Sequence, residues 1–413
     1  MEKVFDVHTH LNPEDLGSKN LKGILGYHFL ISELISCNCP IYKFHNMDDE
    51  KYMEIILPYL KKIKNTSTYW MVKRILQDLY ELDIEELKEK NWKLYDQKIK
   101  EKYKNSGWVW EIIKKSKTCK IFTSRDYSLN HKKDFDYEIF GRTYEKITFG
   151  ITEDMDYMEV WKKNLNGKVN VDNLKNFLKD EVKKAYDMNV YAFVFWVGRY
   201  SFRNVSESEL ATCIKEDGKK DIKKILSCFV FQFLLEQISL LEKTPVIQMI
   251  IGAHVDRIPE TDYSRIFDIS NSDILYSYQK VFDIYNNLHF DILVSSSIRA
   301  RELDTIARMC PNVTLTGNWL HTMFPNQIKK IFSDRLEFVP FVKLGGFFSD
   351  AYSVEWLYGK LVLVEKCIKE VIDEKIEEGF WKEDYRSEIL NSLFWENPYR
   401  IYISKRRYHE NRK

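Results

Sequence analysis

Short apolar runs alternate with longer segments of helical periodicity along the whole chain. Several runs, such as VYAFVFWV at residues 190–197, are apolar or aromatic at every position, as is typical of parallel strands covered by helices. Eight runs are predicted as strands: Val4–Val7, Cys119–Thr123, Lys146–Ile151, Val190–Val197, Val246–Ile251, Phe290–Val294, Asn312–Thr316 and Phe341–Phe348. Eight strands alternating with helices predict an α/β fold, the (β/α)₈ TIM barrel.

The gap between the first and second predicted strands is much longer than the others. Its segments KYMEIILPYLKKIKN, YWMVKRILQDLYEL and DIEELKEKNWKLYDQKIKEKYKN repeat apolar residues every three or four positions, with charged residues between them. This spacing predicts amphipathic helices. We expect residues 40–115 to form a helical insertion on the active-site side of one barrel domain that spans residues 1–413, because barrels grow in the loops that follow their strands.

Composition adds constraints on partners and compartment. The formal net charge of the 413 residues is +1, which gives no reason to expect nucleic acid or an anionic membrane as a partner. We find no secretory leader and no run of about 18 apolar residues that would span a membrane. The seven cysteines are scattered, and the one close pair, Cys37 and Cys39, lacks a second pair for a zinc site. We expect buried thiols in a cytoplasmic protein.

The strongest chemical signal is the sequence Asp6-Val7-His8-Thr9-His10 at the end of the first predicted strand. Side chains alternate between the faces of a strand, so His8 and His10 are expected to point the same way. Barrel enzymes place their catalytic groups at the C-terminal strand ends. Two imidazoles there suit a divalent metal such as Zn²⁺ or Mn²⁺.

Asp350 ends the eighth predicted strand, in the segment Leu344–Asp350. Strand eight neighbours strand one in a closed barrel, so this carboxylate is expected to reach the same metal or to act as a base. The alternative is a carboxylate that caps the helix beginning near Ser353.

The arrangement of two histidines after strand one and an aspartate after strand eight resembles that of the amidohydrolase superfamily. Within it, the chain resembles the uronate isomerase (glucuronate isomerase) branch. The resemblance rests on short motifs across nearly the whole chain: VHTHLNPEDL, Tyr27-His28-Phe29, Cys119–Asp126, Gly317-Asn318-Trp319, GGFFSDAYS and Phe394–Tyr402. It implies one divalent metal ion, zinc before manganese, a small-molecule sugar acid as substrate, and a homo-oligomer.

The chain also departs from this branch. Tyr352 stands where the family has an arginine two residues after its aspartate, Ile250 replaces a histidine of strand five, and Arg125 alters the end of strand two. Superfamily members with two metals add a lysine after strand four and histidines after strands five and six. Strand four here ends in WVGR and strand six in VSSS, so one metal is expected.

Other residues near the predicted mouth are candidates for catalysis or substrate binding. His28 is a candidate catalytic group because its imidazole titrates near neutrality, unless it lies on a helix surface. An arginine fork binds a carboxylate bidentately, although a surface ion pair is the alternative for each arginine. The remaining substrate-binding candidates are Tyr27, Arg199, Arg203, Arg257, Trp319 and His321.

Three functions stay open at this stage. The first is a hexuronate aldose–ketose isomerase, with Asp350 or His28 as base and one of the arginines on the substrate carboxylate. The second is a mononuclear metal-dependent hydrolase of an amide, ester or lactone, in which Asp350 takes a proton from metal-bound water. The third is a barrel without catalytic activity, retained as a sugar-acid-binding or structural protein.

Overall fold

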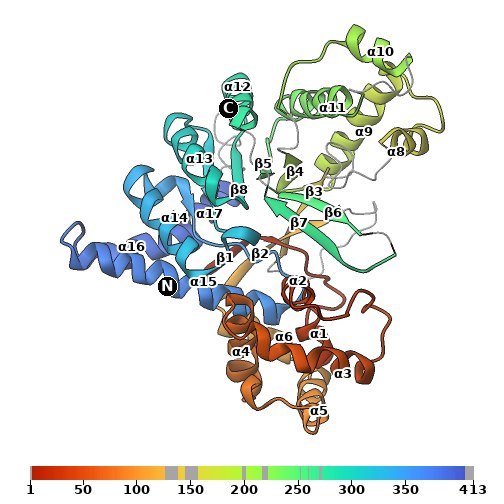
Figure 1. The fold of residues 1–413 in the computed structure, drawn as a ribbon. Coiled ribbons are helices and arrows are strands. Elements are labelled where there is room, and N and C mark those ends of the chain that lie inside the picture. Colours follow the sequence, from red (N-terminus) through yellow and green to blue (C-terminus); the bar gives the residue numbers. More distant parts are fainter. Residues whose placement is uncertain are drawn as a thin grey trace.

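The computed structural model describes residues 2–125, 138–144, 157–197, 201–215, 222–251, 253–258, 260–268 and 272–404. Eight parallel strands form one curled sheet, and helices cover its outer side, as Figure 1 shows. The strands, in the order in which they pair, are β1 (Val4–Thr9), β2 (Thr118–Arg125), β3 (Glu138–Thr143), β4 (Ala192–Val197), β5 (Val246–Ile251), β8 (Phe290–Val294), β9 (Val313–Thr316) and β10 (Leu344–Gly345). The predicted (β/α)₈ barrel is confirmed.

The third strand is not where the apolar pattern placed it. The prediction was Lys146–Ile151, which lies outside the described residues, whereas β3 runs over Glu138–Thr143 between β2 and β4. The sequence EIFGRT hides this strand because it carries a fully buried glutamate and a glycine. Gly141 is required there, since a Cβ would lie 2.2 Å from Cζ of Phe122.

Hydrogen bonds after β10 bring the two ends of the sheet together. The amide of Asp350 donates to the carbonyl of His8 at 2.8 Å, and the amide of His10 donates to the carbonyl of Ala351 at 2.9 Å. The amide of Ser349 donates to Oδ1 of Asp6 at 2.9 Å. The segment that carries Asp350 is therefore tied to β1, as the closed-barrel prediction required.

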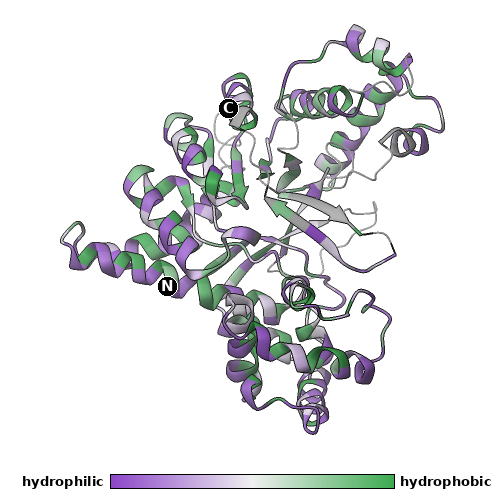
Figure 2. Ribbon diagram, viewed as in Figure 1, coloured by the Kyte–Doolittle hydropathy of each residue, from purple (hydrophilic) through white to green (hydrophobic). Residues whose placement is uncertain are grey.

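Helices fill the intervals between the strands, and each has apolar and polar positions (Figure 2). Between β1 and β2 lie α1 (Leu21–Leu25), α2 (His28–Ser36), α3 (Asp49–Leu60), α4 (Ser67–Tyr80), α5 (Trp92–Lys104) and α6 (Trp108–Lys115). The others are α8 (Tyr157–Asn164), α9 (Val171–Asp187), α10 (Glu207–Lys215), α11 (Ile222–Ser239), α12 (Ser272–Ile284), α13 (Ser297–Met309), α14 (Pro325–Phe338), α15 (Val354–Glu377), α16 (Tyr385–Asn391) and α17 (Asn397–Tyr399).

The helices between β1 and β2 gather on one side of the barrel, in red and orange in Figure 1. Their inner faces are apolar, and α4 and α6 pack against the long helix α15 that follows Asp350. Hence the N-terminal helices and the last barrel helix form one support beside the end of β1.

An apolar cluster fills the barrel interior, and the C-terminal segment contributes Ile401, Tyr402 and Ile403 to it. Side chains of β1 to β8, among them Phe5 and Phe122, pack there with Tyr402. The ring of Tyr402 lies 5.7 Å from that of Phe5 and 5.6 Å from that of Phe122, between centroids. The segment is anchored because the amide of Asn397 donates to the carbonyls of Phe341 and Leu344.

Three further features bear on the sequence predictions. All seven cysteines are free thiols, and four of them, Cys39, Cys228, Cys310 and Cys367, are buried. Among the described helices, none is long and apolar enough to cross a membrane. A two-stranded antiparallel hairpin of β6 (Ala253–Arg257) and β7 (Ser264–Asp268), which the sequence patterns did not predict, follows β5.

Candidate metal centre

The end of β1 presents His8 and His10 through a local irregularity. From Asp6 to Thr9 the strand advances three residues while its partner β2 advances two, from Ile121 to Thr123. Such a bulge re-aims side chains near a strand end. The two imidazole rings lie side by side with centroids 5.0 Å apart. The expectation that both histidines point the same way agrees with this geometry.

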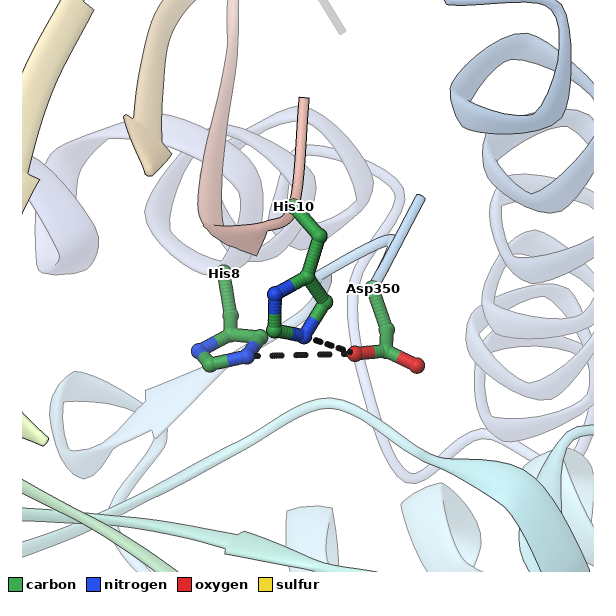
Figure 3. Close-up of side chains that lie close together, drawn as sticks. All are labelled: His8, His10 and Asp350. Carbon is green, nitrogen blue, oxygen red and sulfur yellow. Dashed lines mark ion pairs between the residues drawn. The ribbon is translucent and has the colours of Figure 1, made fainter. Parts of the chain in front are cut away.

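Asp350 faces both rings from the segment after β10 (Figure 3). Its Oδ1 lies 3.1 Å from Nε2 of His10 and 3.8 Å from Nε2 of His8. The residue has a φ of +51°, a left-handed conformation in which aspartate is tolerated better than most residues. Asp350 does not cap the next helix, because the N-cap of α15 is Ser353.

The electrostatics of these groups favour a cation between them. Burial, and after it the neighbouring His10, lower the pKa of His8 to about 4, so the ring is neutral at pH 7. Burial raises the pKa of Asp350, but the hydrogen bond and positive charge of His10 outweigh it and hold the pKa well below its usual range. The carboxylate is therefore ionised beside a neutral ring.

The three side chains fit a metal ion. One ligand atom from each of His8, His10 and Asp350 lies within 4.8 Å of the other two. Nε2 of His8 is buried and has no hydrogen-bond partner among the described residues, although it faces a carboxylate oxygen. Two imidazole nitrogens and one carboxylate oxygen are a ligand set that Zn²⁺ and similar divalent ions accept.

Trp319 holds the second oxygen of Asp350. Its Nε1 donates to Oδ2 at 2.7 Å, and its indole is buried. The ring also packs edge-on against Trp196 at 5.1 Å between centroids. The structure thus brings Trp319, a predicted site residue, into contact with the carboxylate, and the contact fixes which oxygen faces the histidines.

Tyr27 and Lys360 brace the backbone that carries Asp350. The hydroxyl of Tyr27 donates to the carbonyl of Asp350 at 3.2 Å, and Nζ of Lys360 donates to Tyr27 at 2.6 Å and to the carbonyl of Ser349 at 2.5 Å. Lys360 is fully buried, and this burial lowers the pKa of its ammonium to about 8. The left-handed backbone of Asp350 costs free energy, and these two side chains hold the turn in that conformation.

His28 and Tyr352 form an aromatic wall beside the centre. The ring of Tyr352 stacks on His10 at 5.0 Å and meets His28 edge-on at 5.7 Å, between centroids. Burial lowers the pKa of His28 to about 3, although the charge of Asp350 raises it. His28 is therefore a neutral imidazole near the carboxylate, and Tyr352, which is half exposed, covers the ring of His10.

The remaining predicted residues are placed elsewhere or lie outside what the structure describes. Arg203 forms two hydrogen bonds with Glu209, at 3.1 and 2.5 Å, so its fork already holds a carboxylate of this chain. Arg199 and the side chain of Arg257 lie outside the described residues. Within the described part of the chain, no hydrogen bond or ring contact joins His321 to His8, His10 or Asp350.

Sequence patterns did not single out three groups that support the centre: Gln248, Tyr402 and Lys360. Oε1 of Gln248 accepts from Nδ1 of His8 at 2.5 Å, and its Nε2 donates to the hydroxyl of Tyr402 at 2.6 Å. A signal was present, since Gln248 and Lys360 are lone polar residues in the apolar runs VIQMII and WLYGKLVLV. A polar residue at such a position is buried and needs hydrogen-bond partners.

Comparisons with known proteins identify solved structures that share this fold. No family model matches the chain, and no curated protein matches it in sequence. Among solved structures, a uronate isomerase from Thermotoga maritima superposes with a TM-score of 0.83 at 15% identity, over 97% of this chain and 94% of that one.

Two further structures are similar over the same share of the chain. A glucuronate isomerase from Caulobacter crescentus gives a TM-score of 0.80 at 12% identity and is covered to 91%. A uronate isomerase from Bacillus halodurans C-125 gives 0.73 at 18% identity and is covered to 93%. Each match covers 97% of this chain. At these identities the similarity establishes a shared fold over nearly the full length.

Proposed function

We propose that this chain is a metal-dependent isomerase that converts an aldose hexuronate, of the glucuronate or galacturonate type, into the 2-keto sugar acid. The observation that carries the proposal is the fold shared with three uronate and glucuronate isomerases over 97% of the chain. The cluster of His8, His10 and Asp350 at the strand ends supports it, because catalytic groups of barrel enzymes lie there.

The reaction is redox-neutral and needs only proton movements. One hydrogen passes from C2 to C1 of the open-chain sugar, and one proton passes from the C2 hydroxyl to the former aldehyde oxygen. The site must therefore offer a base near C2 and a group that stabilises negative charge on oxygen. A divalent ion at the His8, His10 and Asp350 centre, most simply zinc, supplies polarisation of a substrate oxygen.

Asp350 and His28 are the candidates for moving the proton. Asp350 is ionised and His28 is neutral at pH 7, since their pKa values lie below the ordinary values of aspartate and histidine. Both are thus in the form that accepts a proton. Trp319 holds Oδ2 of Asp350, so Oδ1 is the oxygen available to a substrate or a metal.

Fewer arginines remain as candidates for binding the substrate carboxylate. The bond of Arg203 to Glu209 makes it a poor candidate, because a second carboxylate would have to displace the first. Arg199 and Arg257 remain the proposed carboxylate ligands. His321 remains a candidate substrate ligand, since its Nε2 is buried without a hydrogen-bond partner in the described part of the chain. The free thiols suit a reducing cytoplasm.

The decisive experiment is a ketose-forming assay with glucuronate and galacturonate on protein of known metal content. We expect turnover by the zinc- or manganese-loaded protein. The Asp350→Asn variant should lower kcat by about a hundred- to ten-thousandfold, as expected for loss of a proton-transfer group. Asp334→Asn, on the exposed face of α14, is the matched control and should keep full activity.

The assay also separates the proposal from hydrolysis. Stoichiometric metal binding without ketose formation from either sugar acid would contradict the isomerase and favour a mononuclear hydrolase, for which lactones and amides are the substrates to screen. Equal activity of wild type and Asp350→Asn would contradict the role of the carboxylate.

A further inference from the structure

A line of buried polar side chains runs from His8 across the barrel interior. Nδ1 of His8 lies 2.5 Å from Oε1 of Gln248 on β5. Nε2 of Gln248 lies 2.6 Å from the hydroxyl of Tyr402, which lies 2.7 Å from Oδ2 of Asp291 on β8. All four side chains are buried. We call Gln248, Tyr402 and Asp291 the His8 support network.

The direction of each hydrogen bond follows from its neighbours. Nε2 of Gln248 also lies 2.8 Å from the carbonyl of Val7, which only accepts, so this atom must be the amide nitrogen. Asp291 is an acceptor when ionised, and its other oxygen receives the hydroxyls of Thr314 and Thr316 at 3.0 and 2.7 Å. Tyr402 therefore donates to Asp291 and accepts from Gln248.

These directions determine the tautomer of His8. Both hydrogens of the Gln248 amide are used, toward Val7 and Tyr402, so only its oxygen faces the imidazole. Nδ1 of His8 must then carry a hydrogen and donate it. The lone pair of the neutral ring is left on Nε2, the nitrogen that faces Asp350.

We propose that the His8 support network is a positioning device that fixes His8 in its Nδ1–H tautomer and aims Nε2 at the metal ion. The inference rests on the metal centre of the proposed function and is independent of the substrate. A ligand histidine whose second nitrogen donates to a fixed acceptor is held in orientation and is more basic toward the metal. The C-terminal segment thereby contributes to the metal site through Tyr402.

The geometry distinguishes this role from simple filling of the core. An apolar residue at position 248 would fill the same space but would remove the acceptor of His8 and the donor to Tyr402 and to the carbonyl of Val7. The ring of Tyr402 is fixed by packing on Phe5 and Phe122, so its hydroxyl can hold the amide in one orientation. Removing the hydroxyl alone tests the network without removing the packing.

The test uses four variants of the full chain and two measurements. Gln248→Met keeps the shape and removes every hydrogen bond, Gln248→Glu keeps an acceptor for His8, and Tyr402→Phe removes one hydroxyl. Tyr358→Phe is the control, because its hydroxyl also donates to a carboxylate, Asp78 at 3.0 Å, but on the outer helices. Zinc affinity is measured by competition with a chromophoric chelator, and the His8 tautomer by ¹⁵N NMR of the metal-free protein.

We expect Gln248→Met to bind zinc about ten- to a hundredfold more weakly than wild type, as is typical for loss of such a partner. Tyr402→Phe should weaken binding several-fold, and Tyr358→Phe should leave it unchanged. Wild type and Gln248→Glu should show the Nδ1–H form of His8, and Gln248→Met should lose it. Gln248→Glu should keep its zinc affinity even if it unfolds at a lower temperature.

Two results would overturn the inference. One is wild-type His8 in the Nε2–H form. The other is zinc binding by Gln248→Met and Tyr402→Phe as tight as that of wild type. Should Gln248→Met fail to fold, the hydroxyl deletion and the wild-type NMR spectrum still decide. Absence of zinc binding by wild type would count against the proposed metal centre instead, while the NMR measurement continues to test the tautomer.

Discussion

The polar groups inside the barrel and those at its strand ends are satisfied to different degrees. Inside, Asp291 accepts hydrogen bonds from Tyr402, Thr314 and Thr316, and Gln248 uses both amide hydrogens. The C-terminal strand ends, by contrast, carry buried side chains with no hydrogen-bond partner among the described residues, among them Ser124 near the end of β2, Ser296 after β8 and Asn318 after β9.

This difference distinguishes the interior groups, which support the candidate site, from the groups at the strand ends, which can still form hydrogen bonds to a ligand. A satisfied buried network stabilises one arrangement, whereas an unpartnered buried group costs free energy until something binds it. The strand ends are also where the candidate metal centre lies and where the proposed sugar-acid substrate would find donors and acceptors. Substitutions inside the barrel should thus mainly lower stability, whereas substitutions at the strand ends should mainly lower activity.

The largest loss of stability should come from Asp291→Ala inside the barrel. The substitution leaves the hydroxyls of Tyr402, Thr314 and Thr316 without their acceptor, and we expect unfolding to become easier by about 4 kcal/mol. Urea unfolding of the metal-free protein measures this, with the exposed Asp334→Ala as control. A loss below about 1 kcal/mol would mean that the interior network does not stabilise the fold.

Lys360→Met should have the next largest effect. It removes the donor to Tyr27 and to the carbonyl of Ser349, and with it the support of the turn at Asp350. We expect the free energy of unfolding to fall by about 3 kcal/mol, because each buried group left unpaired costs about 1–3 kcal/mol. Zinc affinity should fall as well. Unchanged affinity would show that the Asp350 turn needs no such brace.

Acid should weaken the metal-free protein through His8 and His28. Burial lowers their pKa values from 6.5 to about 4 and about 3, so both stay neutral when folded while the unfolded chain takes up protons. Their contribution is complete above pH 6.5 and is lost as the pH falls toward 4. Lowering the pH from 7.5 to 5 should reduce the free energy of unfolding by about 2 kcal/mol for each of the two histidines.

Urea unfolding at the two pH values measures this loss. The His28→Gln variant has one buried imidazole fewer, and its stability should fall by about 2 kcal/mol less than that of wild type over the same interval. An identical fall in both proteins would contradict a buried neutral His28.

The smallest change in stability should come from Asn318→Leu at the strand ends. Its amide has no partner to lose in the described structure, so the stability should change by less than about 1 kcal/mol. By contrast, Asn397→Leu loses bonds to Phe341 and Leu344 and should cost about 2 kcal/mol. If Asn318 binds the substrate, KM for the hexuronate should rise about tenfold. Equal stability costs would remove the distinction between the two regions.

The sequence by itself predicted the barrel and the three candidate metal ligands. Short, mainly apolar runs identified seven of the eight strands, because parallel strands covered by helices are buried on both faces. His8 and His10 were predicted because strand alternation places them on one face, and Asp350 because the last strand of a barrel adjoins the first. The strand β3 was missed because a buried glutamate and Gly141 break its apolar pattern.

Only the tertiary structure decided which distant residues support those ligands. Gln248 contacts His8 from β5 and is linked through Tyr402 of the C-terminal segment to Asp291 on β8. Lys360 reaches the turn of Asp350 from α15. No local pattern encodes such contacts, since each depends on how far a strand or helix is translated and rotated in the packed barrel. The same is true of Arg203. The sequence suggested that its guanidinium binds a substrate carboxylate, whereas in the fold it binds the carboxylate of Glu209.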